Sequence, residues 1–300
     1  MYTVSGPVKQ GSKLGTMGIG PLAALIFLIA ALGSAQVPAP DADSIIRRSL
    51  ERDTENESRL KDYTYTENRQ TQTLDKTGAV VKTETVTLDI VNLYGSQYGR
   101  RIARNGRPLE GKEKQKVDQE FDKETRKREQ ETPEERAKRE AEQEKDQAQA
   151  RNFLQEIPKA YFLKIAAQEA IDGLPVWVIE ATPRPDFHPT VKHAELLKKL
   201  YGRIWIDQSS YQWVRAEAEV LQPITFGGFL FKLDRGARMT FLQTRVNDEV
   251  WLPAKMTARI DARLLMKHFN LASETTWSDY RKFQVDSRIV TGEEAAGPQR

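Results

Sequence analysis

The sequence predicts an α+β fold built on one large antiparallel β-sheet. Alternating patterns rich in β-branched and aromatic residues recur through most of the chain, which is typical of strands. Short turn signals separate them, at 75–78, 105–106, 172–173 and 247–248. Helical patterns are confined to a few segments. Strands that follow one another through short turns pair as neighbours, so a single meandering sheet is expected.

Residues 1–35 have the pattern of an export signal. Lys9 and Lys13 supply positive charge without an acid, and residues 21–33 are uncharged. Gly33-Ser34-Ala35 offers small residues for cleavage before Gln36. As a helix, the uncharged stretch would be about 20 Å long, short of the bilayer's apolar core of about 30 Å. We expect a periplasmic or secreted protein, with an uncleaved anchor at 17–35 as the alternative.

The composition excludes several classes of protein. The chain has no cysteine, so it has no disulfide, no thiol catalysis, no cysteine metal site and no acylated cysteine of its own. The net charge of +3 is too small for a typical nucleic-acid-binding domain. We expect a monomer that needs no cofactor.

The first predicted elements are a helix over 41–61 and a hairpin. Ile46 and Leu50 are four residues apart, and Asp41, Asp43 and Ser44 offer N-cap side chains. Alternation over 63–73 and 79–94, around the turn at 75–78, predicts two long strands. A further strand over 99–103 precedes the Asn-Gly turn.

A charged insertion follows, at about 111–158. Between Lys112 and Arg151 there are twelve basic and thirteen acidic side chains. Thr132-Pro-Glu-Glu135 has the pattern of a capping box, a strong helix start. Glu and Lys or Arg then recur four residues apart, which favours a solvated helix or helical hairpin. It is interpreted either as a docking arm for a partner or as a surface insertion without a partner.

The second half of the chain predicts a series of strands. Their expected ranges are 161–170, 175–182, 202–207, 211–221, 238–246, 250–260 and 275–289, with a short helix at 193–200. Gly227-Gly228 is expected to mark a bend. The tail, 291–300, is expected to be loose.

No catalytic or metal-binding residues are assigned. Asp186, His188 and His193 are close in sequence, but the prolines around them break the regular spacing that converging ligands need. A hydrolase that uses these three residues is a further alternative. Nucleophile-elbow, phosphate-loop and dinucleotide motifs are absent from the sequence.

The strand aromatics are the candidate binding residues. Their ordinary role is core packing, but a partly covered sheet face lined by them would also make an apolar cavity. The candidates are Trp177, Trp205, Trp213, Phe229, Phe231, Phe241 and Trp251.

Several motifs resemble those of outer-membrane lipoprotein-sorting proteins. Asp172 to Pro183 (DGLPVWVIEATP) resembles their D-G-x-P-x-x-V-x-E-x-x-P hairpin. Gly202 to Asp207, with its W-I-D strand, and the return strand at 214–217 resemble the next hairpin. The segments 250–253 and 280–283 are similar to the closing strands. The family with these motifs is the LolA/LolB-like superfamily, which also includes the sensor RseB.

The resemblance implies an open antiparallel half-barrel with helices on its concave side, formed here by a single domain at 36–300. It implies a non-catalytic protein that binds a lipid, an acyl chain or a lipoprotein, with transient contact to a membrane surface. The alternative is an envelope sensor or adaptor that binds a protein partner through the insertion at 112–151. The insertion is a departure from the family pattern.

Overall fold

The computed structural model describes residues 40–226, 231–265 and 267–282. The predicted export signal at 1–35, the glycine pair at 227–228, Phe229 and the predicted tail at 291–300 lie outside these residues. Within the described ranges, no helix is long and apolar enough to cross a membrane.

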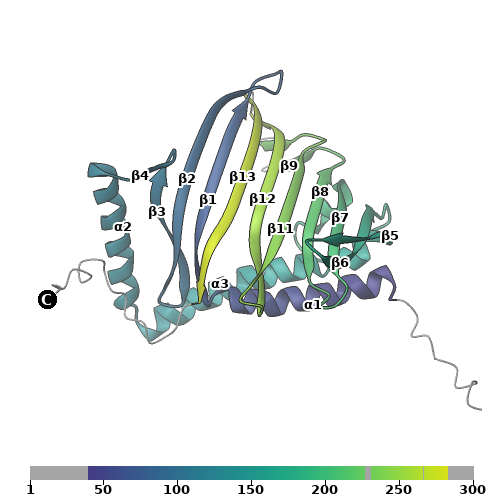
Figure 1. The fold of residues 1–300 in the computed structure, drawn as a ribbon, viewed down its shortest axis with the longest axis horizontal. Coiled ribbons are helices and arrows are strands. Elements are labelled where there is room, and N and C mark those ends of the chain that lie inside the picture. Colours follow the sequence, from purple (N-terminus) through teal and green to yellow (C-terminus); the bar gives the residue numbers. More distant parts are fainter. Residues whose placement is uncertain (1–39, 227–230, 266, 283–300) are drawn as a thin grey trace, which may run out of the picture. The chain divides into compact units, whose positions relative to one another are not determined.

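Thirteen strands form one antiparallel sheet (Figure 1). In chain order they are β1 (Tyr63–Leu74), β2 (Val80–Leu93), β3 (Ser96–Arg104), β4 (Arg107–Pro108), β5 (Tyr161–Ile171), β6 (Leu174–Pro183), β7 (Leu200–Asp207), β8 (Trp213–Val220), β9 (Ile224–Phe226), β10 (Phe231–Leu233), β11 (Arg238–Val246), β12 (Val250–Leu264) and β13 (Lys267–Lys282). The main path is β4-β3-β2-β1-β13-β12-β11-β8-β7-β6-β5, and β9 and β10 branch from β12. Across the described residues the sheet stays open, which confirms the predicted fold class.

The N-terminal hairpin is joined to the end of the chain. Strand β1 pairs with β13 along nearly its whole length, from the Tyr63–Lys282 pair to the Leu74–Asn270 pair. Sequence alternation predicted both strands but not this partnership, which closes a loop of about 200 residues. The predicted last strand also begins too late, at 275 instead of 267. The β12–β13 turn was missed because Leu265, which takes a left-handed φ of 55°, is not a usual turn residue.

The helical elements are α1 (Ala42–Leu60), α2 (Gly111–Glu129), α3 (Pro133–Leu154), α4 (Ile157–Ala160) and the 3₁₀ helix η1 (Ala194–Lys199). Helix α1 begins where predicted, because the Asp41 carboxylate accepts a hydrogen bond of 2.8 Å from the Ser44 amide. It runs across one end of the strands and contacts β5 and β12 (Figure 1).

Helix α1 is held on the sheet by an apolar cluster. Ile45 and Ile46 pack with Trp177, Ile179 and Ile206, all of them buried. Trp177 and Ile179 are two residues apart in β6, and Ile206 pairs with Trp177 from β7, so these side chains share one face. A second cluster packs α4 and η1 on the same face through Ala181. This face of the sheet carries the helices.

The insertion is attached to the sheet edge. The Phe121 ring of α2 lies 5.6 Å from the Tyr98 ring of β3, centroid to centroid. In α3, Arg139 donates to the Tyr94 carbonyl oxygen at 3.2 Å, and Gln143 Nε2 donates to Ser96 Oγ at 2.8 Å. Neither α2 nor α3, both fully described, has a buried residue. The predicted solvated helices form, but contacts at several points hold them against the edge of the sheet.

Replacing the N-cap of α3 should loosen its first turn. Thr132 Oγ1 accepts from the Glu135 amide at 3.2 Å, and the Glu135 carboxylate accepts from the Thr132 amide at 2.9 Å. Thr132→Ala should therefore cost about 1 kcal/mol of helix stability, roughly a fivefold loss of hydrogen-exchange protection in that turn. Thr125→Ala, inside α2, is the matched control. Equal effects of the two variants would contradict a capping role.

Candidate functional site

Two adjoining cavities lie between the helices and the sheet. The first, which we call the apolar hollow, has a volume of about 330 Å³. Its lining is mainly apolar and includes Ile46, Leu50, Leu154, Leu163, Ile204 and Phe241. The second, which we call the polar hollow because Asp53, Asn56, Glu57, Arg151 and Gln243 line it, has a volume of about 250 Å³. Both are lined by Leu50, Asp53 and Leu154, so the two cavities meet at this point of α1 and α3.

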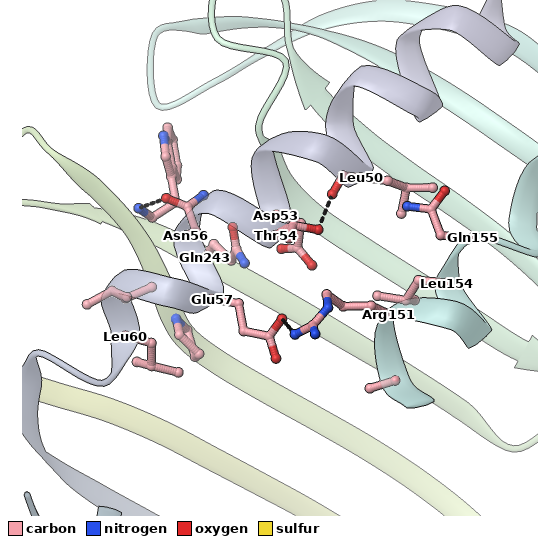
Figure 2. A pocket seen from close by; sticks show the side chains of 14 residues that line it. Leu50, Asp53, Thr54, Asn56, Glu57, Leu60, Arg151, Leu154, Gln155 and Gln243 are labelled. Atoms are coloured by element: carbon pink, nitrogen blue, oxygen red, sulfur yellow. Dashed lines mark hydrogen bonds and ion pairs between the residues drawn. The ribbon is translucent and has the colours of Figure 1, made fainter. Parts of the chain in front are cut away.

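The polar hollow lies where α1, the end of α3, β11 and β12 meet (Figure 2). Arg151 of α3 donates to the Glu57 carboxylate of α1 at 3.2 Å, an ion pair between two residues of the lining. Asn56 Oδ1 accepts from the backbone amide of Trp251 at 3.3 Å and so joins α1 to β12 (Figure 2). The last residues of the insertion therefore form part of the cavity wall.

An amide network fixes the second half of α1. Asn56 Nδ2 donates to Gln212 Oε1, and Gln212 Nε2 donates to Gln243 Oε1 at 2.8 Å. Gln212, which precedes β8, is 1% exposed. A buried amide with both ends bonded holds its neighbours in one arrangement. Helix α1 is thus anchored by apolar contacts in its first half and by hydrogen bonds in its second.

Asp53 is a carboxyl group at the boundary of the two hollows. One of its oxygens accepts a hydrogen bond of 2.7 Å from Trp213 Nε1. Burial raises the pKa of Asp53 above 3.8, and the nearby Glu57 carboxylate raises it further. Hydrogen bonds from Trp213 and Gln243 oppose this shift without cancelling it.

Ser49 is a buried hydroxyl that lines the apolar hollow. It is 2% exposed, and its Oγ has no hydrogen-bond partner among the described residues. Ser49 lies one helical turn before Asp53, so the two side chains are neighbours on the same face of α1. An unpaired buried hydroxyl costs free energy, and a polar group in the hollow would relieve it.

The predicted aromatic residues of the described ranges lie in several different places. Trp213 and Phe241 line the apolar hollow, and Trp251 borders the polar one. Trp177 is buried in the cluster under α1, with its ring 5.3 Å from that of Tyr211. Phe231, in β10, pairs with Leu264 and is part of neither cavity lining.

Trp205 packs on the other face of the sheet. Its cluster contains Val176 and Val178, which alternate with Trp177 along β6. Trp205 Nε1 donates to Glu169 at 3.1 Å, and the Arg215 guanidinium is 4.6 Å from the ring centroid. Trp251 also packs against this cluster. Sequence alternation alone did not distinguish the two faces.

Ser49, Asp53 and Gln243 were not among the predicted site residues. A signal for the first two was present: the apolar stripe of the predicted helix is narrow because Ser49 and Asp53 interrupt it. Asp186, His188 and His193 belong to no potential metal site, because no group of three or more ligand-type side chains gathers anywhere in the described ranges.

The raised pKa of Asp53 predicts a pH effect on stability. The folded protein binds a proton at higher pH than the unfolded chain, so this carboxyl destabilises the fold at pH 7, and the penalty is relieved as the pH falls toward about 4. Asp53→Asn should therefore be more stable than the parent at pH 7 and lose that advantage by pH 4. Urea unfolding at several pH values measures the difference, with Glu51→Gln on the exposed face of α1 as the control. A difference that is constant with pH would contradict the assignment.

Solved structures of low sequence identity are similar to this chain. A LolA superfamily protein from Nitrosomonas europaea is 14% identical, with 82% of this chain and 94% of that chain covered and a TM-score of 0.30. A lipoprotein-sorting protein domain from Vibrio parahaemolyticus is 12% identical, with 81% and 95% covered and a TM-score of 0.32. A DUF1329 family protein from Desulfovibrio piger is 10% identical, with 83% and 96% covered and a TM-score of 0.34.

The first two carry the family names that the sequence motifs resemble. No family model and no curated protein sequence matches the chain. TM-scores this low carry no information on function, and the fold rests on the strand order and register described above.

Proposed function

We propose that this chain is a non-catalytic binding protein of the cell envelope that holds an acyl chain of a lipid or lipoprotein. The observation that carries the proposal is the apolar hollow between α1 and the sheet. Its volume of about 330 Å³ is within the range of about 300–1,000 Å³ typical of small-ligand pockets. Its walls come from α1, the end of the insertion, η1 and five strands, which are distant in sequence.

Burial of methylene groups supplies the binding free energy in this proposal. Each methylene removed from water contributes about 0.8 kcal/mol, so ten contribute about 8 kcal/mol before the cost of association. Trp213 and Phe241 would contact the chain, and Leu50 and Leu163 would cover it. Trp251 borders the neighbouring cavity, and Trp177 and Trp205 would support the walls from the core.

Export is a separate part of the proposal and rests on the sequence of residues 1–35. Cleavage before Gln36 would release a single domain at 36–300. The mass of the chain purified from its native host's envelope tests this: a start at Gln36 supports cleavage, and a chain that retains residues 17–35 in the membrane fraction supports an anchor.

Mass spectrometry of organic extracts from the natively purified protein tests the binding function. A lipid or acylated peptide present in stoichiometric amount, and absent from a mock purification, would support it. The purified protein should also enhance the fluorescence of N-phenyl-1-naphthylamine, an uncharged apolar dye. Protein that carries no lipid and takes up no dye would overturn the proposal.

The second candidate is an envelope adaptor that binds a protein partner through α2 and α3. It is supported by the long exposed charged surface of the two helices, which contacts with Tyr98, Tyr94 and Ser96 hold in place. Deleting the whole insertion would not separate the two functions, because Arg151 and Leu154 line the cavities. Exchanging exposed charges on α2, such as Lys116→Glu with Glu120→Lys, leaves the cavities intact and should abolish partner capture only.

A further inference from the structure

We infer, on the basis of the proposed function, that the apolar hollow selects acyl compounds with an uncharged head group that carries both a hydrogen-bond acceptor and a donor, such as an amide or an alcohol. The same hollow rejects free carboxylates. Ser49 and Asp53 are the groups that make this selection.

The first step in the argument is the unpaired hydroxyl of Ser49. It is 2% exposed, lines the apolar hollow and has no partner among the described residues. Buried polar groups in folded proteins are nearly always paired, so an unpaired one in a cavity wall indicates a missing partner. A hydroxyl can donate to the carbonyl oxygen of a ligand.

The second step is the charge at the boundary of the hollows. Asp53 accepts from Trp213, which leaves other lone pairs of its carboxylate able to accept from a ligand N–H or O–H. Glu57 adds a second carboxylate nearby. Of the two cations in the lining, Arg151 is paired with Glu57 at 3.2 Å. Arg203 extends from β7 toward Trp205 on the other face of the sheet, where it pairs with Glu180 at 2.6 Å.

A ligand carboxylate at this position would therefore meet like charge without a free cation. Like charges a few ångströms apart in a partly desolvated site repel strongly. An amide or alcohol meets no such repulsion. Its oxygen can accept from Ser49, and its N–H or O–H can donate to Asp53, because neighbouring turns of α1 present the two side chains together.

Three probes with the same twelve-carbon chain test the inference: dodecanamide, dodecanol and dodecanoic acid. Each is titrated at pH 7.5 against bound N-phenyl-1-naphthylamine. The amide and the alcohol should displace the dye at concentrations at least about tenfold lower than the acid. Equal displacement by all three would overturn the inference and leave the binding function standing. Failure of the dye and of all three probes to bind would overturn both.

Two variants and their controls assign the selection to residues. Asp53→Asn, which keeps an acceptor for Trp213, should reduce the preference for the amide and the alcohol over the acid to less than about threefold. Ser49→Ala should weaken binding of the amide and of the alcohol about fivefold. Glu51→Gln and Ser58→Ala make the same chemical changes on the exposed face of α1. They should change neither the preference over the acid nor the affinity for the amide and the alcohol. An unchanged preference in Asp53→Asn would overturn the role of Asp53.

Discussion

Ala216→Trp should block the hollow while the protein stays folded. Ala216 lines the apolar hollow and lies between Ile204 and Phe241 on the neighbouring strands. An indole at this position would occupy space needed by the ligand. Displacing about three methylene groups, at ~0.8 kcal/mol each, weakens binding about fiftyfold. The displacement titration with dodecanamide measures the effect, and the urea midpoint checks that the fold is retained.

Thr240→Trp is the control for this variant. Thr240 precedes Phe241 in β11 and pairs with Glu217 and Thr257, so its side chain is on the opposite face of the same strands. The substitution adds similar bulk next to the same strands without entering the hollow. If both variants bind the probe as the parent does, the ligand does not occupy the apolar hollow.

Ile45→Ala should cause a large loss of stability. Ile45 is fully buried, in the cluster that joins α1 to Trp177, Ile179 and Ile206. Truncating a buried isoleucine to alanine removes apolar contacts and leaves a cavity, which together cost about 2–5 kcal/mol. Urea unfolding at pH 7 measures the change in the free energy of unfolding.

The comparison for Ile45→Ala is Arg47→Ala, two residues away on the exposed side of α1. It should change the stability by no more than about 0.5 kcal/mol. A cost below about 1 kcal/mol for Ile45→Ala would mean that α1 does not depend on this cluster. The hollow would then lack a fixed wall, and the proposed binding site would fail with it.

Local patterns in the sequence were enough to predict most of the secondary structure and the fold class. Alternation of apolar and polar residues has a period of two in a strand, and it predicted β1, β2, β5 and β6 to within about two residues. The cap at Asp41 and the capping box at Thr132 fixed the starts of α1 and α3, because each depends on side chains within three residues.

Which sheet faces and which distant segments meet became visible only in the folded chain. Trp205 and Trp213 have the same chemistry and lie in neighbouring strands, yet one packs on the face away from the helices and the other donates to Asp53 in the hollow. Alternation identifies the two faces of a strand but does not say which one a helix will cover. That choice depends on contacts such as β1 with β13 and Asn56 with Gln212, between residues more than 150 positions apart, which only the packing of the whole chain selects.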